Sequence, residues 1–326
     1  MSGSPILITG AAGFIGSHLA EALLTRGHRV VGVDNFDPFY GREHKEANLR
    51  EVARHQRAGG FEFVEGDICD AALMDALTAR TRPEGIIHIA ARAGVRPSIA
   101  DPRGYAMTNL VGTAVVMEAA RAAGCSRLVI ASSSSVYGNN AKTPFSEDDA
   151  VEHPISPYAA TKRANELMGH THWHLTGMPT AMLRFFTVFG PRQRPDLAIR
   201  KFLSRVGAGE EIEMFGDGST SRDYTYIDDI VAGIIAAYDR VPTLGYRVWN
   251  LGGNHPISLA GLIEAVGATV GRAPRIVRRP MQPGDVERTW ADLTRSRAEL
   301  GYAPGTSLEE GLRRQWAWMT RPGARH

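Results

Sequence analysis

The chain has 326 residues, of which 43% are hydrophobic and 22% are charged. This balance is typical of a globular protein and excludes a collagen-like, coiled-coil or disordered chain. At about 100–200 residues per domain, the length allows two domains. The 37 basic and 35 acidic residues leave a net charge of +2, so no single-sign field indicates a nucleic-acid partner.

The two cysteines, Cys69 and Cys125, lie far apart in the sequence. They suggest neither a disulfide framework nor a metal knuckle, and they favour a reducing compartment. No stretch approaches the roughly 18 apolar residues of a membrane span. No basic leader precedes the first apolar segment. We therefore expect a cytoplasmic protein that does not associate with membranes.

In the first half of the chain, short β-branched runs alternate with longer segments of helical period, which predicts βαβ units. We expect strands at 6–8, 29–33, 61–64, 86–89 and 128–131. Helices are expected between them at 14–26, 43–57, 71–80 and 105–123, and a later helix at 158–175 leads to a strand at 180–183. The predicted fold class is therefore α/β, with a Rossmann-type doubly wound parallel sheet.

From about residue 185, turns rich in glycine and proline interrupt shorter elements. We expect residues 1–184 to form a nucleotide-binding domain and residues 185–326 a smaller mixed substrate domain, with some exchange of chain between them. The second domain is expected to contain helices at 227–239, 259–270 and 308–319.

A glycine-rich turn follows the first predicted strand, with Gly10, Gly13 and Gly16 spaced three residues apart before a helix. The first glycine permits a positive φ, the second lets the backbone approach a pyrophosphate, and the third packs the helix onto the strand. The anion then lies at the helix N-terminus, where N–H groups and the macrodipole favour negative charge. The turn therefore predicts a dinucleotide site.

Asp34 ends the second predicted strand, where a carboxylate accepts hydrogen bonds from ribose hydroxyls and repels a 2′-phosphate. This favours NAD over NADP as the cofactor. The other strand ends face the same groove, because ligands bind at the carboxyl ends of parallel strands. The expected cofactor-binding residues are Gly10, Gly13, Phe14, Ile15, Gly16, Asp34, Asn35, Asp67, Ile68, Ala90, Ala91, Arg92, Asn109, Tyr158 and Lys162.

Tyr158 and Lys162 stand one helical turn apart after the fifth strand, which ends in the serine cluster 132–135. Oxidation of a secondary alcohol needs a base for the hydroxyl proton, and a phenol with a pKa of about 10 is a poor one at neutral pH. A neighbouring ammonium lowers that pKa. We therefore expect Tyr158, Lys162 and Ser133 to be catalytic, with Ser133 holding or relaying the proton of the alcohol.

These residues make the chain resemble the extended short-chain dehydrogenase/reductase family over nearly its whole length. Within that family it is most similar to the nucleotide-sugar 4-epimerases, and among them to the UDP-glucuronate 4-epimerases. The segments that carry the narrower resemblance are 91–98, 184–196 and 281–286. The resemblance implies a UDP-sugar substrate and a transient 4-keto sugar that takes the hydride back on its other face. It also implies a homodimer.

Two serines distinguish the chain from other relatives. The similar 4,6-dehydratases carry an Asp-Glu pair before the Val-Tyr-Gly, and the UDP-glucuronate decarboxylases carry a glutamate there. This sequence has Ser134 and Ser135. We therefore expect return of the hydride and not elimination or loss of carbon dioxide.

The expected substrate-binding residues are Arg96, Ser133, Ser134, Thr187, Arg194, Arg222 and Asp285. Arg222 lies in a stretch that resembles the family's diphosphate-binding segment, and a guanidinium fork suits a diphosphate. Arg194 can pair with the carboxylate of a hexuronate, whose burial is costly without a partner. Alternatively, Arg194 caps a turn and Arg192 takes that role.

Other interpretations of the sequence remain. His170 and His174 share a helical face, but neither a carboxylate nor a cysteine completes a ligand set nearby, so we expect no metal. UDP-glucose or a UDP-N-acetylhexosamine is the alternative epimerase substrate. A non-catalytic NAD-binding regulator on the same fold is the alternative from a different class.

Overall fold

The structure is a computed structural model that describes residues 3–281 and 286–321. Seven parallel strands form its main sheet, in the order β10-β6-β5-β4-β1-β2-β3. The strands are β1 (Ile6–Thr9), β2 (Val30–Asp34), β3 (Phe61–Glu65), β4 (Gly85–His88), β5 (Arg127–Ser133), β6 (Thr180–Phe185) and β10 (Tyr246–Leu251). The strand order reverses between β1 and β4, which opens a crevice at their carboxyl ends. The predicted Rossmann-type α/β fold is confirmed.

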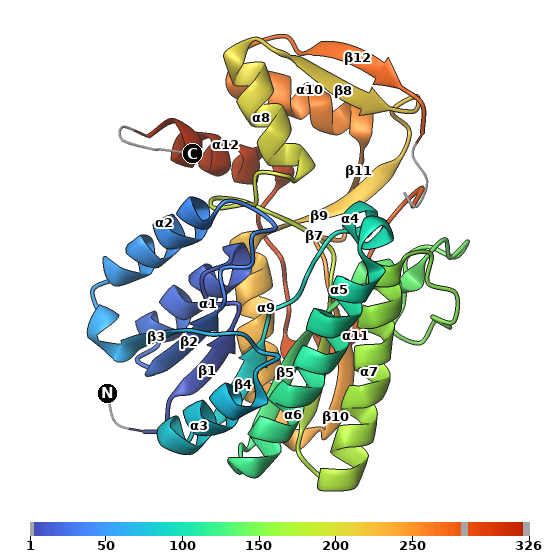
Figure 1. Ribbon diagram of the computed structural model, residues 1–326. Helices are drawn as coiled ribbons and strands as arrows, with labels where there is room; N and C mark the ends of the chain where they lie inside the picture. The colour runs from blue at the N-terminus through green and yellow to red at the C-terminus, as the bar shows by residue number, and fades with distance from the viewer. Residues whose placement is uncertain (1–2, 282–285, 322–326) are drawn as a thin grey trace.

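Alternate residues of each strand pack into two hydrophobic cores, because successive side chains of a strand point to opposite faces. Ile6 and Ile8 of β1 pack on one face, whereas Leu7 packs on the other. One face is covered by α1 (Phe14–Thr25), α2 (Arg42–Ala53), α9 (Ile227–Arg240) and α11 (Thr294–Leu300), and the other by α3 (Ala71–Thr81), α6 (Gly112–Ala122) and α7 (Pro157–Thr176). Figure 1 shows these helices on either side of the strands.

Two elements from the later half of the chain belong to the main sheet or to the helices that cover it. Helix α9, expected at 227–239 in the second domain, packs against α1, β5 and β6. Strand β10, which the sequence analysis did not identify, pairs with β6 at the edge of the main sheet. The helical period of 227–239 correctly predicted a helix, but local periodicity does not specify which sheet a helix covers.

The helix expected at 105–123 is divided into three parts. The α-helix α5 (Pro102–Ala106) is followed by a π-helical turn, η2 (Met107–Val111), and then by α6. A π-helical turn of this kind often occurs at functional sites, because it redirects a side chain within a helix. Here the turn contains Asn109, whose side chain is buried against the β4–α4 segment. Helix α4 (Val95–Ala100) precedes α5.

A smaller unit lies over the carboxyl ends of the main sheet (Figure 1). Its three-stranded sheet has the order β11-β9-β7, and a second sheet pairs β12 with β8. The elements of this unit are β7 (Thr187–Phe189), α8 (Ala198–Ala208), β8 (Glu211–Phe215), β9 (Ser221–Tyr226), β11 (Pro256–Ser258), α10 (Leu259–Val270), β12 (Arg275–Arg279) and α12 (Leu308–Thr320). Short helical turns lie at η1 (Ala58–Gly60), η3 (Ser134–Tyr137) and η4 (Val241–Thr243).

Within residues 3–281 and 286–321, no helix has both the length and the apolar character needed to cross a membrane.

Candidate active site

A cavity of about 370 Å³ lies in the crevice between the main sheet and the smaller unit. It is the place where most of the predicted site residues meet. Its lining includes Gly10, Gly13, Phe14, Ile15, Gly16, Asp34, Asn35, Ile68, Ala90, Ala91, Arg92, Ser133, Ser134, Tyr158, Lys162, Thr187 and Arg194.

The glycine turn closes the floor of this cavity so tightly that side chains would not fit. Gly10 has a φ of +73°, and a Cβ there would lie 2.8 Å from the Ala90 backbone nitrogen. A Cβ on Gly16 would lie 2.1 Å from the Gly10 carbonyl oxygen. Gly13 is the N-cap of α1 and has no side chain to cap the first turn, so the helix N-terminus opens into the cavity. This geometry fits the pyrophosphate of a dinucleotide.

Asp34 lies at the end of β2, is 7% exposed, and lines the cavity. Its Oδ1 accepts hydrogen bonds from the Phe36 backbone N–H at 2.9 Å and from Lys45 Nζ at 3.2 Å. Lys45 is itself buried on α2 and lines the same cavity. The carboxylate is therefore fixed at the position where a ribose would bind, with a cation beside it.

Tyr158 and Ser133 meet at the other end of the cavity. Tyr158 is the second residue of α7, after the N-cap Ser156 and Pro157, and Ser133 ends β5. The Ser133 hydroxyl also donates to Ser135 Oγ at 3.1 Å. Burial raises the pKa of Tyr158, while its hydrogen bond with Ser133 and the charge of Arg194 lower it. Ser133 is thus the serine of the cluster that contacts the phenol.

Lys162 has a different immediate partner from the one we expected. Its Nζ donates to the backbone carbonyl of Ala131 at 2.7 Å. Burial lowers the pKa of Lys162 to about 8, and the charge of Glu166 partly offsets that effect. The cation that lowers the pKa of Tyr158 here is Arg194 and not Lys162. Both side chains line the cavity.

A buried ion pair supports the catalytic segment from behind. Arg184 of β6 forms two hydrogen bonds of 2.8 Å with the carboxylate of Glu166 on α7. The Ser132 hydroxyl donates to the same carboxylate at 2.7 Å. The Ser132 hydroxyl therefore binds Glu166, whereas the Ser133 hydroxyl contacts Tyr158.

The two arginines that competed for the sugar site are separated by the structure. Arg192 hydrogen-bonds to Glu21 and Ser17 of α1, and it does not line the cavity. Arg194 lines the cavity, with its guanidinium 5.0 Å from the centre of the Phe39 ring. Its Nε and Nη2 donate to the Asp196 carboxylate at 3.0 and 2.7 Å.

Four predicted residues lie outside the cavity lining. Asp67 accepts a hydrogen bond from the Asn35 side chain at 2.9 Å, and Asn109 bonds to the backbone N–H and carbonyl of Arg92. Arg96 lies 4.9 Å from the Phe215 ring, and Arg222 donates to the Ser221 carbonyl at 2.9 Å. Asp285 lies outside the described residues.

The sequence analysis missed several lining residues, among them Asp37, Phe39, Tyr40, Lys45 and Thr108. They come from the β2–α2 segment, from α2 and from the π-helical turn. A lysine on a helix and an aspartate in a loop carry no local signal, and only the fold brings them to the cavity. In the described ranges, no group of three or more His, Cys, Asp and Glu side chains is arranged to hold a metal ion.

Comparison with known proteins places the chain in a family. Residues 7–315 match the model of the GDP-mannose 4,6 dehydratase family. The chain belongs to this family. The resemblance drawn from the sequence is confirmed by its relatives. A probable UDP-glucuronate 4-epimerase of Rhizobium meliloti is 43% identical, and the alignment covers 96% of each chain.

Solved structures extend the similarity to the whole fold. The UDP-glucuronic acid 4-epimerase of Bacillus cereus, in complex with UDP-glucuronic acid and NAD, is 34% identical with a TM-score of 0.90. The UDP-glucose 4-epimerase of Thermotoga maritima, with UDP-glucose, is 32% identical with a TM-score of 0.87. Each match covers 97% of this chain and 98% of the other.

Proposed function

We propose that the protein is an NAD-dependent isomerase that interconverts UDP-glucuronate and UDP-galacturonate by epimerisation at C4 of the sugar. One observation carries this proposal. A single cavity joins the glycine turn and Asp34 to Ser133 and Tyr158, with Arg194 on the same wall. The R. meliloti and B. cereus relatives, whose names specify glucuronate, support the choice of sugar.

Bound NAD supplies a hydride acceptor, and later a hydride donor, for C4 of the sugar. The glycine turn and the N-terminus of α1 hold its pyrophosphate, and Asp34 holds the adenosine ribose. Asn35, Ile68, Ala90, Ala91 and Lys162 complete the proposed cofactor contacts, with Asp67 and Asn109 supporting them from behind.

Tyr158 accepts the proton of the sugar 4-hydroxyl at its phenolic oxygen, and Ser133 hydrogen-bonds to the same oxygens. The positive charge of Arg194 favours the phenolate. Lys162 adds a second cation at the cavity wall. The pair Tyr158 and Ser133 thus moves the proton, and the charge of Arg194 favours the phenolate that accepts it.

Arg194 carries the choice of a hexuronate. A hexose needs only hydroxyl partners, whereas the carboxylate of a hexuronate needs a cation when it is buried. Arg194 is 15% exposed at its side chain and lines the cavity beside Thr187. The Asp196 carboxylate occupies the Nε–Nη2 edge of the guanidinium and holds its plane, so that Nη1 lies on the opposite edge. Thr187 and Ser134 add neutral hydroxyls for the sugar.

The serines support epimerisation over elimination or decarboxylation. Ser134 and Ser135 line the cavity at the two positions where related dehydratases carry an Asp-Glu pair, and Ser135 stands where the decarboxylases carry a glutamate. Ser135 is hydrogen-bonded to Ser133. Positions 134 and 135 therefore lack the carboxylic acid that those relatives carry to assist the departure of water or carbon dioxide.

Arg96 and Arg222 are proposed to bind the diphosphate of the substrate. Arg96 lies on α4 against Phe215 of the smaller unit, and Arg222 lies on β9 of that unit. Neither residue is in the cavity lining, so this part of the proposal rests on the resemblance of their sequence segments to those of the family.

The test is to incubate the purified protein with UDP-glucuronate, UDP-glucose and UDP-N-acetylglucosamine and to separate the products. We expect UDP-galacturonate from the first and slow or no turnover of the others. Arg194→Ala should weaken catalysis on UDP-glucuronate by about 2–5 kcal/mol more than any activity on UDP-glucose, because both reactions lose the charge that favours the Tyr158 phenolate but only glucuronate loses the partner of its carboxylate. Equal losses on both sugars, or a preference for UDP-glucose, would favour the alternative UDP-glucose or UDP-N-acetylhexosamine epimerase.

We also propose that the protein works as a cytoplasmic homodimer. Exposed apolar side chains lie on neighbouring elements η2 and α7, with Met107 54% and Leu167 55% exposed. Val111 extends this surface, and such a patch is typical of a self-association interface. The two free cysteines favour a reducing compartment. Sedimentation of the wild type and of Leu167→Glu tests the dimer: only the variant should sediment as a monomer.

A further inference from the structure

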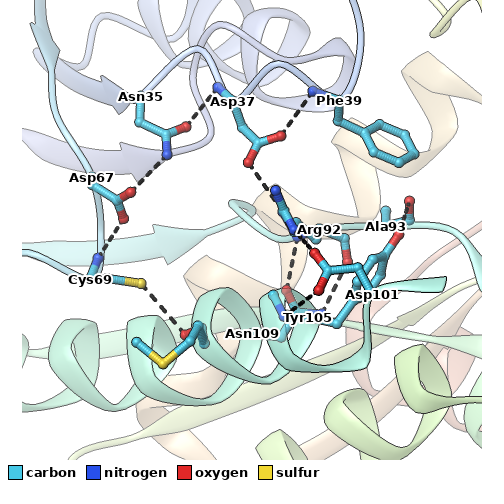
Figure 2. A network of polar contacts seen from close by, with 12 residues as sticks. Asn35, Asp37, Phe39, Asp67, Cys69, Arg92, Ala93, Asp101, Tyr105 and Asn109 are labelled. Atoms are coloured by element: carbon cyan, nitrogen blue, oxygen red, sulfur yellow. Dashed lines mark hydrogen bonds and ion pairs between the residues drawn. The ribbon is translucent and has the colours of Figure 1, made fainter. Parts of the chain in front are cut away.

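Arg92 links two segments that both line the cavity. It lies after β4, and its Nε donates to Asp37 Oδ2 at 3.1 Å in the β2–α2 segment. Its Nη1 donates to Asp101 Oδ2 at 2.6 Å, between α4 and α5. Figure 2 shows the guanidinium between the two carboxylates. One cation thus joins three loops at the carboxyl edge of the sheet.

Each partner in this cluster is fixed by a second set of bonds. Asp37 Oδ1 accepts from the Phe39 N–H at 2.9 Å, and Asp101 Oδ1 accepts from the Gly104 N–H at 3.0 Å as the N-cap of α5. Asn109 holds the Arg92 backbone at both its N–H and its carbonyl. Because every member is anchored in its own loop, the ion pairs couple the positions of these loops.

Gly104 makes room for the cluster. A Cβ there would lie 2.2 Å from Arg92 Nη1 and 2.1 Å from Asp101 Oδ2. The β2–α2 segment is also tied on its far side, where the Asn35 amide donates to Asp67 Oδ2 at 2.9 Å (Figure 2). A continuous polar chain therefore runs across the carboxyl edge from the end of β3 to the start of α5.

We propose that Arg92, Asp37 and Asp101 form a clasp that holds the two cavity walls together over bound NAD and slows its release. Asp37 and Arg92 both line the cavity, beside Asn35 and close in sequence to Asp34. A dinucleotide held by the glycine turn and Asp34 would lie beside the segments that the clasp joins, so its release would require the clasp to open. An epimerase returns its hydride and gains from keeping its nucleotide between turnovers. The clasp rests on the NAD part of the proposed function and is independent of the sugar.

The two carboxylates distinguish a clasp from a phosphate-binding arginine. If Arg92 contacted the pyrophosphate directly, Asp37 and Asp101 would compete with the phosphates, and removing either carboxylate would slow NAD release or leave it unchanged. In a clasp, removal of any one of the three charges speeds release. The opposite signs make the two roles separable by substitution.

The experiment measures NAD release directly, with no sugar present. Full-length protein loaded with NAD is mixed with excess isotopically labelled NAD, and the unlabelled nucleotide retained is followed by mass spectrometry. We expect Arg92→Gln, Asp37→Asn and Asp101→Asn each to release NAD at least fivefold faster than the wild type. The asparagines keep Oδ1 as an acceptor for the Phe39 or Gly104 N–H, so their loops stay capped. Arg92→Gln/Asp37→Asn should be no faster than the faster single variant, because both remove the same link.

Arg103→Gln is the matched control, since it removes an exposed positive charge from the same helix, α5, and should release NAD at the wild-type rate. Release within twofold of the wild type for both Asp37→Asn and Asp101→Asn would overturn the clasp, even if Arg92→Gln were faster. Equal acceleration by Arg103→Gln would overturn it as well, because it would reduce the effect to net charge. A wild-type protein that binds no NAD would overturn the proposed function together with the clasp, whereas the first two outcomes leave that function standing.

Discussion

Tyr158 is held between opposing influences on its acidity. Burial raises the pKa of its phenol, and the Ser133 hydrogen bond and the Arg194 charge lower it. The ring also packs edge to face against Tyr105, with 6.2 Å between the ring centres. These contacts fix the phenol in place without making it a base by themselves. Proton transfer at neutral pH therefore depends on the positive charges that converge on the cavity.

Tyr158→Phe tests this role. The substitution removes the proton acceptor but keeps the ring and its contact with Tyr105, so we expect turnover to fall by about 10² to 10⁴-fold. The NAD content of the purified variant should match that of the wild type, as measured by extraction and chromatography. A variant that retained most of its turnover would remove Tyr158 from the mechanism.

The residues that a motif contains were predictable, and the residues that only tertiary contacts bring together were not. Gly10, Asp34 and Tyr158 have fixed spacings from strands and helices, so their place in the cavity followed from the sequence. Lys45 and Asp37 reach the same cavity only because the fold brings α2, which packs against α1, and the β2–α2 segment to it. Arg184 and Glu166 are 18 residues apart on two different elements, and no local sequence pattern predicts their ion pair.

At the scale of elements, helical and strand periods identified where helices and strands lie in the first half. They did not reveal the π-helical turn, because the turn accompanies a long-range contact, the hydrogen bond from Asn109 to the backbone of Arg92. They also did not reveal β10, because this edge strand is defined by its parallel pairing with β6, which is distant in the sequence. The position of α9 on the main sheet depends in the same way on contacts with α1.

Glu166 joins three elements, since it sits on α7 and binds Ser132 of β5 and Arg184 of β6. Its side chain is 0% exposed and that of Arg184 is 2% exposed. Glu166→Gln presents an amide N–H to the guanidinium and leaves a buried charge unpaired. We expect the free energy of unfolding to fall by about 3–5 kcal/mol, measured by denaturant titration.

Glu118→Gln provides the matched control for that experiment. Glu118 forms an exposed ion pair with Arg121 on α6, with side-chain exposures of 61% and 53%. Exposed pairs are worth little, so the same substitution there should change the free energy of unfolding by less than about 1 kcal/mol. Similar losses in the two variants would mean that the buried network does not join the elements as the contacts indicate.

At the scale of the whole molecule, the site belongs to neither unit alone. The Rossmann sheet supplies the glycine turn, Ser133 and Tyr158, and the chain beyond β6 supplies Thr187 and Arg194. The smaller unit therefore positions the residues proposed to select the sugar over a dinucleotide floor. Arg194 also acts on the Tyr158 phenol, so this segment couples the proposed choice of sugar to the chemistry.

The buried histidine His88 couples the stability of the whole molecule to pH. It is 2% exposed on β4, and its two ring nitrogens lie 2.7 Å from Thr9 Oγ1 and 3.0 Å from Thr113 Oγ1. Burial, and then the charge of Lys162, lower its pKa to about 3. An unfolded histidine has a pKa of about 6.5, so between pH 6.5 and 3 the unfolded chain binds a proton that the folded chain does not. Folding is therefore progressively disfavoured as the pH falls below 6.5.

At pH 5 this proton stabilises the unfolded chain, and the free energy of unfolding is lower by about 2 kcal/mol, which is 1.5 pH units at about 1.36 kcal/mol each. His88→Asn removes the titrating group. The variant should be less stable than the wild type at pH 8, because it loses contacts with Thr9 and Thr113, but that difference should shrink by about 2 kcal/mol at pH 5. Urea titrations of both proteins at the two pH values measure the change. A difference that stays constant from pH 8 to 5 would mean that His88 takes up its proton in the folded protein as readily as in the unfolded chain. That outcome would contradict the interpretation of His88 as a buried neutral imidazole between Thr9 and Thr113.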